Sequence, residues 1–272
     1  MSSLMPLLRR WVLLSVLLAC GCGVRAQEAA RPLRLCADEA PLYPWRLAEP
    51  RRAGALPAGL DFVLIEQAAA RMGLALELSL MPWRRCQTEL QRGGQDAALG
   101  MSYRSDRMQF AIFPWRDMAP DEGLRMRRES YSLYALAQEG PVWDGRHLAA
   151  KGELVVGAPS GYSIVEQLQA MGLKVDEGTR SVEANLEKLV KRRVQALALP
   201  TGEGDEALKR DARWAQRVQR LDPPLVEKSY FLVYSHSYYG GNEAQAKRLW
   251  AELAQVRESA AFKRSEAELL RP

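Results

Sequence analysis

Two groups of short apolar strands alternate with helices along this chain, and this alternation restricts the fold more than any other feature. The first group covers residues 33–101, and the second covers residues 153–200. Each group runs strand, helix, strand, helix, strand. Units of this kind form parallel strands with right-handed crossovers and with helices on both faces of the sheet. The sequence therefore predicts an α/β protein with two similar lobes, each a mainly parallel sheet flanked by helices.

The individual elements follow from apolar periodicity and from the glycines and prolines at their ends. Asp61 is expected to cap the first helix, and Gly73 to end it. Beyond the two groups we expect a helix at 206–220, a strand at 229–235 and a final helix at 242–257. The other expected elements are strands at 33–37, 75–80, 96–101, 131–138, 153–159, 174–178 and 194–200, and helices at 61–71, 82–93, 164–172 and 181–193.

Two connections between the lobes are expected to form a hinge. Residues 131–138 alternate like a strand, and Pro223-Pro224 precedes the strand at 229–235. If the chain crosses twice, its last helix belongs with the first lobe, and two strand-like connections permit closure on a ligand. Tyr131 is expected to pack near this hinge. The predicted boundaries are 31–134 and 228–272 for lobe 1, and 135–227 for lobe 2.

The first 26 residues have the features of a secretory signal peptide. Arg9 and Arg10 precede the apolar run WVLLSVLLAC, and Val24-Arg25-Ala26 fits a small-x-small cleavage site. A second interpretation is a lipoprotein signal, because Leu17-Leu18-Ala19-Cys20 resembles a bacterial lipobox with Cys20 as the lipidated residue. Either route predicts a periplasmic protein.

Removal of this segment lowers the net charge and argues against a polyanionic partner. The whole chain has 38 Lys and Arg against 33 Asp and Glu, a net charge of +5. Without Arg9, Arg10 and Arg25 the counts are 35 and 33, and the net charge is +2. We therefore expect no binding of nucleic acid. The basic runs RMRRE (125–129) and KRR (191–193) are interpreted as solvated surfaces.

The same cleavage leaves two of the four cysteines, Cys36 and Cys86. An even pair in an exported protein predicts a disulfide. Both cysteines follow predicted strands, so neighbouring strands would bring them to one edge of the sheet. The only two histidines, His147 and His236, are far apart in the sequence, which argues against a zinc site. No metal and no cofactor are expected.

The segment 93–115 carries the clearest functional signal. Its apolar strand AALGM ends in a polar loop that contains Ser102 and Arg107. Ligands of open α/β sheets bind beyond the carboxyl ends of the strands, and a hydroxyl beside a guanidinium suits a carboxylate. The competing interpretation is that Arg107 pairs with Asp106 or Asp117 on the surface.

Two long stretches carry a family resemblance. They are GLDFVLIEQAAARMGLALELSLMPWRRCQTELQRGGQDAALGMSYRSDRMQFAIF (59–113) and SYFLVYSHSYYGGNEAQAKRLWAELAQVRES (229–259). The chain resembles, over about residues 33–262, the type 2 periplasmic solute-binding proteins of family 3, which serve polar amino acid ABC importers. The resemblance implies a two-lobed periplasmic-binding-protein-like II fold with a two-strand hinge and a cleft that binds a small, amino-acid-like carboxylate.

The resemblance also implies roles for single residues. Arg107 matches the arginine that holds the ligand's α-carboxylate, with Ser102 as an assisting hydroxyl and Gly100 as a nearby backbone donor. Asp38 matches a polar contact from the loop after the first strand. The alternatives for Asp38 are a local cap and a local ion pair with Arg34.

Three more residues match the family's pocket walls. Trp83 and Trp45 fall where aromatic residues surround the ligand's side chain, and Ser163 matches the second hydroxyl of the family's G-T-T turn. This turn opens a helix, whose free N–H groups suit a carboxylate. The alternatives are core packing for both tryptophans and a helix N-cap for Ser163.

One departure from the family pattern concerns the ligand's amino group. The family places an amine-binding aspartate at the end of the strand written here VQALALP, where this chain has Pro200. Tyr162 also replaces the first threonine of the turn. A buried ammonium without a carboxylate partner is unfavourable by several kcal/mol. Either Glu203 or Asp205 supplies the charge, or the ligand lacks a free amine.

The sequence thus predicts a monomeric, non-catalytic receptor that delivers a small solute to an ABC permease. The alternative is a sensor or accessory module of the same fold that partners a membrane protein without transport. An enzyme is not expected, because the chain has no serine nucleophile elbow, HExxH motif or phosphate loop. Glu39 and Glu66 are candidate acids, and neither has a visible partner in the sequence.

Overall fold

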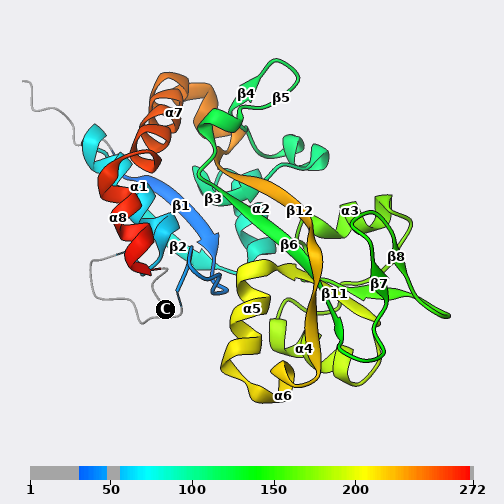
Figure 1. The fold of residues 1–272 in the computed structure, drawn as a ribbon. Helices are drawn as coiled ribbons and strands as arrows, with labels where there is room; N and C mark the ends of the chain where they lie inside the picture. Colours follow the sequence, from blue (N-terminus) through cyan, green and yellow to red (C-terminus); the bar gives the residue numbers. More distant parts are fainter. Residues whose placement is uncertain (1–30, 48–55, 270–272) are drawn as a thin grey trace, which may run out of the picture. The chain divides into compact units, whose positions relative to one another are not determined.

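The computed structural model describes residues 31–47 and 56–269 (Figure 1). The predicted signal peptide, its cleavage site and Cys20 lie outside these residues. Within the described part of the chain, no helix is both long and apolar enough to span a membrane.

A single eight-stranded sheet runs through the described residues in the order β10-β9-β11-β6-β12-β3-β1-β2. Its strands are β1 (Leu33–Asp38), β2 (Leu76–Met81), β3 (Ala97–Ser102), β6 (Arg127–Leu136), β9 (Val155–Gly157), β10 (Lys174–Asp176), β11 (Ala196–Pro200) and β12 (Val218–Tyr234). The short pairs are β4 (Trp115–Arg116) with β5 (Ala119–Pro120), and β7 (Val142–Trp143) with β8 (Leu148–Ala149).

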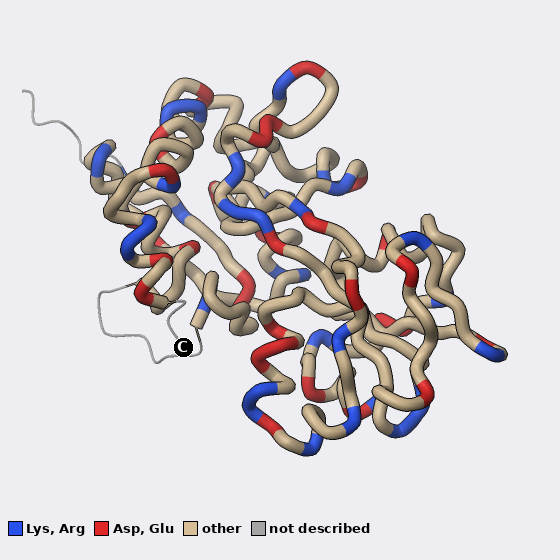
Figure 2. Tube along the Cα trace, in the orientation of Figure 1, with Lys and Arg blue, Asp and Glu red and all other residues tan. Residues whose placement is uncertain are grey.

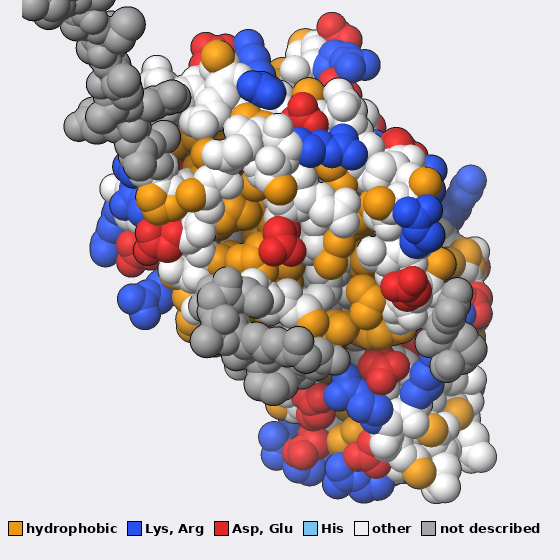
Figure 3. Space-filling model, turned by 90° about the vertical axis from the view of Figure 1, so that its left-hand side faces the viewer, with side chains coloured by type: hydrophobic (Ala, Val, Ile, Leu, Met, Phe, Trp, Pro, Cys, Tyr) orange, Lys and Arg blue, Asp and Glu red, His pale blue; other side chains and the backbone are white. Residues whose placement is uncertain are grey.

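The helices cover the sheet on both sides. They are α1 (Leu60–Met72), α2 (Trp83–Gln91), α3 (Ile164–Ala170), α4 (Val182–Val190), α5 (Thr201–Arg210), α6 (Ala212–Ala215), α7 (His236–Arg257) and α8 (Ala260–Leu269). Two 3₁₀ turns, η1 (Ser105–Gln109) and η2 (Glu122–Leu124), lie in the connections. On the face shown in Figure 3, hydrophobic side chains reach the surface among scattered charged ones.

The two parallel groups predicted from the sequence form the two ends of the sheet. Strands β1, β2 and β3 are parallel, and so are β9, β10 and β11. The long strands β6 and β12 are antiparallel to each other and join the groups (Figure 1). The two-lobed α/β fold with a two-strand connection is therefore confirmed. Below, lobe 1 means β1–β3 with α1, α2, α7 and α8, and lobe 2 means β9–β11 with α3–α6.

Both faces of the inner strands are buried, as expected for parallel strands between helix layers. In β1, Leu35 packs into a core with α1 and α7, whereas the neighbouring Cys36 faces a second core with α2. In lobe 2, Ala198 of β11 packs into one hydrophobic cluster, and the neighbouring Leu199 packs into another on the opposite face. This alternation fixes which residues lie at the strand ends, where the site is formed.

The disulfide prediction is confirmed, because Cys36 and Cys86 are bonded with an S–S distance of 2.03 Å and a Cα–Cα distance of 5.7 Å. The geometry differs from the expected edge contact. Cys36 lies within β1, and Cys86 lies on α2, which packs over that strand. The bond therefore joins a strand to its covering helix.

The predictions for the second half of the chain were partly wrong. The expected helix at 206–220 begins earlier, at Thr201, and Val218 already belongs to β12. Pro200 is the last residue of β11 and the N-cap of this helix. β12 tolerates Pro223 because the pairing with β6 shifts register between Leu221 and Val226. The expected final helix at 242–257 is present as the main part of α7; a kink at Asn242 separates it from an added first segment that begins at His236, and α8 follows it.

The RMRRE run is not a solvated surface. Arg127 and Glu129 are buried on one side of β6, whereas the Arg128 side chain between them is 47% exposed. A strand turns alternate side chains to opposite faces, so half of a charged run can face inward. Elsewhere, basic and acidic residues are interspersed along the trace (Figure 2).

Candidate functional site

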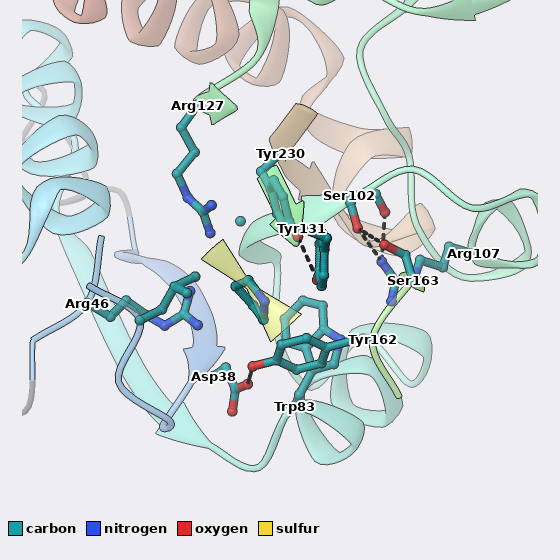
Figure 4. Close-up of a pocket in the computed structure, with 13 residues that line it drawn as sticks. Asp38, Arg46, Trp83, Ser102, Arg107, Arg127, Tyr131, Tyr162, Ser163 and Tyr230 are labelled. Carbon is teal, nitrogen blue, oxygen red and sulfur yellow. Dashed lines mark hydrogen bonds between the residues drawn. The ribbon is translucent and has the colours of Figure 1, made fainter. Parts of the chain in front are cut away.

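A cavity of about 30 Å³ lies where the carboxyl ends of β1 and β3 meet the loop before α3 and the middle strands β6 and β12. Its walls combine charged, hydroxyl and aromatic side chains (Figure 4). It is lined by Asp38, Leu42, Arg46, Trp83, Gly100, Ser102, Arg107, Arg127, Tyr131, Tyr162, Ser163, Pro200 and Tyr230. Six of the seven residues implied as ligand contacts by the family resemblance are among them.

Arg107 is buried at one end of the cavity, on η1 directly after β3. Its Nη1 donates to the Ser102 carbonyl at 2.7 Å and to Ser102 Oγ at 3.2 Å, and its Nη2 donates to the Gly161 carbonyl at 3.2 Å. Its Nε has no hydrogen-bond partner in the described chain. Burial, with a smaller contribution from Arg104, lowers the pKa of Arg107 to about 10.

The surface ion pair proposed as an alternative for Arg107 is wrong. Asp106 instead pairs with Arg104, whose Nε donates to Asp106 Oδ1 at 2.6 Å. Within the described residues, Arg107 forms no ion pair with any carboxylate. A buried guanidinium that is held only by neutral oxygens remains attractive to an anion.

Ser163 is the N-cap residue of α3, but its hydroxyl lies at this end of the cavity. Ser102 Oγ donates to Ser163 Oγ at 2.8 Å, and Lys228 Nζ donates to the Ser163 carbonyl at 2.9 Å. Ser163 makes no side-chain capping bond to α3, which has only seven residues. Burial, followed by repulsion from Arg107, lowers the pKa of Lys228 to about 8. Lobe 1, β12 and lobe 2 therefore meet at one hydroxyl.

Aromatic rings form the middle of the cavity (Figure 4). The Trp83 ring centroid lies 5.9 Å from Arg107 Cζ, and the hydroxyls of Tyr131 and Tyr230 are hydrogen-bonded at 3.0 Å. Tyr131 thus lines the cavity in addition to packing on the middle strands. Burial raises the pKa of Tyr131 well above its usual value, so its hydroxyl stays protonated.

Asp38 connects the two lobes instead of pairing with Arg34. Tyr162 donates its hydroxyl proton to Asp38 Oδ2 at 3.1 Å, and Arg180 Nη1 lies 3.4 Å from Asp38 Oδ1. Arg34 pairs with Asp96 at the other end of β1. Asp38 is therefore occupied by lobe 2 when the cavity is closed.

Trp45 is the one implied contact that lies outside the cavity lining. Its Nε1 donates to Glu129 Oε2 at 2.5 Å, and its ring centroid lies 5.0 Å from Arg127 Cζ. The hydrogen bond turns the ring toward Arg127, so Trp45 contacts a residue of the cavity wall rather than the cavity itself.

No protein-family model matches this sequence, and no curated protein matches it. Solved structures match over most of the chain. The ligand-binding core of GluR0 in complex with L-glutamate is 14% identical, with 89% of this chain and 100% of that chain covered and a TM-score of 0.68. The chain has the two-lobed fold of the type 2 periplasmic binding proteins.

Two further structures with this periplasmic-binding-protein fold differ in their biological setting. One is the substrate-binding protein of an amino acid ABC transporter, 14% identical, with 88% and 99% of the two chains covered and a TM-score of 0.65. The other is a histidine kinase sensor domain with similarity to periplasmic binding proteins, 17% identical, with 87% and 95% covered and a TM-score of 0.65. At these identities the likeness establishes the fold.

Sequence reasoning missed three charged or aromatic residues that line this site, and the acidic residue that holds one of them. Tyr230 and Arg127 lie on the middle strands, where period-two alternation in SYFLVYS and RRES was an available signal. Arg46 lies in a loop rich in proline and glycine, and no local pattern marks it. Asp61 was expected to cap α1, but α1 begins at Leu60, and Asp61 is buried within it against Arg127.

The two acidic substitutes considered for the missing amine-binding aspartate behave differently. Asp205 is occupied, because Tyr134 donates to its Oδ1 at 2.9 Å and Arg220 lies 2.5 Å from its Oδ2. Glu203 lines an outer groove of about 690 Å³ that shares Arg46 and Tyr162 with the cavity. Burial raises the pKa of Glu203 to about 8, so it is mostly neutral at pH 7.

Across the described residues, no group of three or more His, Cys, Asp or Glu side chains is placed to hold a metal ion. The chemistry of the cavity is instead that of guanidinium donors, hydroxyls and aromatic rings. Such a set has donors suited to an oxyanion.

Proposed function

We propose that this protein binds a small carboxylate-bearing solute in the cavity between its lobes, with Arg107 as the principal contact, and that it does so without catalysis. One observation carries the proposal: Arg107 is 2% exposed and has no carboxylate partner in the described part of the chain. A charged donor buried in this way is costly unless a ligand oxygen completes it. Ser102 and Ser163 place two hydroxyls beside it.

Ligand binding requires the lobes to separate. Ligand pockets usually measure about 300–1,000 Å³, whereas this cavity has about 30 Å³. The contacts between the lobes include Ser102 with Ser163, Tyr162 with Asp38 and Arg180 with Glu39 at 3.6 Å. We expect rotation about β6 and β12 to break these contacts. A ligand that adds bonds to both lobes stabilises the closed form.

The setting we propose is the periplasm, with the protein acting as a monomer that delivers its solute to an ABC permease. The substrate-binding protein of an amino acid ABC transporter has the same fold, and this likeness supports the setting. Sensing is the second candidate, since a histidine kinase sensor domain has the same fold as well. Co-purification from native membranes separates the two: recovery of a permease and its ATPase supports transport, and recovery of a kinase supports sensing.

The binding proposal is tested with purified mature protein and a panel of small carboxylates, amino acids and neutral osmolytes. A ligand at 100 times its Kd adds about 2.7 kcal/mol, which corresponds to a rise in Tm of about 5–10 °C for a domain of this size. Calorimetry then gives the Kd for wild type, Arg107→Ala and the control Arg116→Ala, whose side chain is 70% exposed and pairs with Asp121.

We expect carboxylates to bind, Arg107→Ala to lose at least about 100-fold in affinity and Arg116→Ala to stay close to wild type. Melting of each variant without ligand shows that it is folded. The proposal is refuted if no carboxylate shifts Tm, or if folded Arg107→Ala binds as tightly as wild type.

A further inference from the structure

A second buried guanidinium, that of Arg127, faces the same cavity from the opposite end to Arg107 (Figure 4). Its side chain is 1% exposed and lies at the start of β6. Only Nε is hydrogen-bonded, to Asp61 at 3.0 and 3.3 Å. Both Nη1 and Nη2 are buried without a hydrogen-bond partner among the described residues. Four N–H donors are therefore unused.

The surroundings of Arg127 hold it in place but leave these donors open. The Tyr230 and Trp45 ring centroids lie 4.2 and 5.0 Å from its Cζ, so aromatic rings contact the guanidinium. A Cβ built on Gly100 would lie 3.4 Å from Arg127 Nη2, and Gly100 itself lines the cavity. The absence of a side chain at this position, where φ is +70°, leaves space in front of Nη2.

The charges around Arg127 are incompletely balanced. Asp61 is shared, because Arg46 Nη1 also lies 3.5 Å from its Oδ2. Glu129 Oε2 lies 3.6 Å from Arg127 Nη1 and already accepts a hydrogen bond from Trp45. Burial raises the pKa of Glu129, which weakens its hold on Arg127. Of the residues that line the cavity, three are arginines and one is an aspartate, Asp38, which Arg180 and Tyr162 occupy.

From these contacts we infer that the cavity binds a small dicarboxylate, with one carboxylate at Arg107 and the other at the free Nη1 and Nη2 edge of Arg127 beside Gly100. This inference rests on the proposed function for the Arg107 end and adds the second subsite. Two parallel N–H groups match the two oxygens of a carboxylate. The rings of Tyr131, Tyr230 and Trp83 between the two ends then contact the carbon chain of the ligand.

The test compares ligands that differ only at the far end. Calorimetry on wild type measures straight-chain dicarboxylates of three to seven carbons, their half-amides and the monocarboxylates of equal length. A charge-assisted hydrogen bond of about 1.5–3 kcal/mol predicts that the best dicarboxylate binds about 10- to 100-fold more tightly than its monocarboxylate. The half-amide, which keeps one acceptor oxygen but no charge, is expected between them.

Variants assign the preference to Arg127. In Arg127→Gln the dicarboxylate and the monocarboxylate should bind with nearly equal affinity. The matched control is Arg128→Gln, since Arg128 is the exposed neighbour on the same strand and pairs with Glu122 and Glu227. It should keep the full preference. If Arg127→Gln does not fold, the comparison of dicarboxylates with monocarboxylates on the wild type still tests whether the second subsite exists.

The possible failures are distinguishable. If carboxylates bind and depend on Arg107, but mono- and dicarboxylates bind equally to wild type, the second subsite is overturned and the proposed function stands. The same holds if folded Arg127→Gln keeps the dicarboxylate preference. If no carboxylate binds, or if Arg107→Ala changes nothing, the proposed function fails first.

Discussion

Asp96 is the most heavily hydrogen-bonded carboxylate among the described residues, and its replacement tests the electrostatic description directly. It lies just before β3 with its side chain 2% exposed. Arg31 Nη1 and Nη2 donate to it at 2.6 and 3.1 Å, and Arg34 donates through its backbone N at 2.9 Å and through Nη2 at 2.8 Å. These bonds tie the start of β1 to the start of β3.

The size of the effect follows from the pKa. Burial alone would raise the pKa of Asp96, but the hydrogen bonds from Arg31 and Arg34 outweigh it and lower the pKa from 3.8 to about 2. Each pKa unit corresponds to about 1.4 kcal/mol, which gives an upper value of about 2.4 kcal/mol at neutral pH. Arg31 is 58% exposed, so solvent screens its share, and about 1–2 kcal/mol remains.

The perturbation is Asp96→Asn, which keeps the shape and removes the charge. A lowered carboxyl pKa stabilises the folded state above the unfolded-state value near 3.8, and this stabilisation is lost as pH falls through about 2. Urea unfolding at several pH values should therefore show the variant about 1–2 kcal/mol less stable above pH 5. The difference should shrink steadily between pH 4 and pH 2. A difference that is absent at pH 7, or that is unchanged at pH 2.5, would refute the reasoning.

Two further predictions concern the disulfide and the pH dependence of binding. The Cys36–Cys86 bond closes a loop of 50 residues, for which the chain-entropy estimate is about 4 kcal/mol. The double serine variant should therefore lose about 2–4 kcal/mol of unfolding free energy, measured by urea unfolding. An unchanged urea midpoint would contradict this prediction. An anion bound beside Lys228 raises the pKa of that amine from about 8, so carboxylate affinity should fall by up to about tenfold between pH 7 and pH 9.5. Lys228→Met should flatten this profile; a profile that changes only in Glu203→Gln would assign the effect to the Glu203 carboxyl instead.

Most of the fold could be predicted from the sequence because its strands are buried on both faces and its helices end at glycines. The segments β1, β3 and β11 are short apolar runs, and the structure places each within one or two residues of the expected bounds. The long strand β12 was harder. Its first half, from Val218 to Glu227, is mostly exposed and contains two prolines, so neither apolar content nor alternation distinguished it from a helix and a loop.

The candidate site likewise contains some residues that could be predicted from the sequence and others that could not. Arg107 and Ser102 follow a strand end directly, and chain order alone brings them together. Arg127 meets them only because β6 pairs with β12, which pairs in turn with β3, and no local pattern encodes that order. Asp96 is the aspartate in GGQDAALGM, a part of the stretch that carries the family resemblance, and its contacts all hold the fold together. A residue in a strong motif can therefore serve the fold, whereas a residue in an unremarkable basic run lines the cavity.

The charge arrangement also bears on the family's missing amine contact. Pro200 lines the cavity where an aspartate was expected, and each nearby carboxylate is occupied or neutral. Asp38 is held by Arg180 and Tyr162, Asp61 by two arginines, and Glu203 is mostly protonated at pH 7. An ammonium enclosed here would lack a counter-ion and would face the arginines, which costs several kcal/mol. The same arrangement that leaves Arg107 and Arg127 open to oxygen acceptors thus disfavours a free amine. The open guanidinium groups and the missing counter-ion for an ammonium both favour a ligand that carries carboxylates alone.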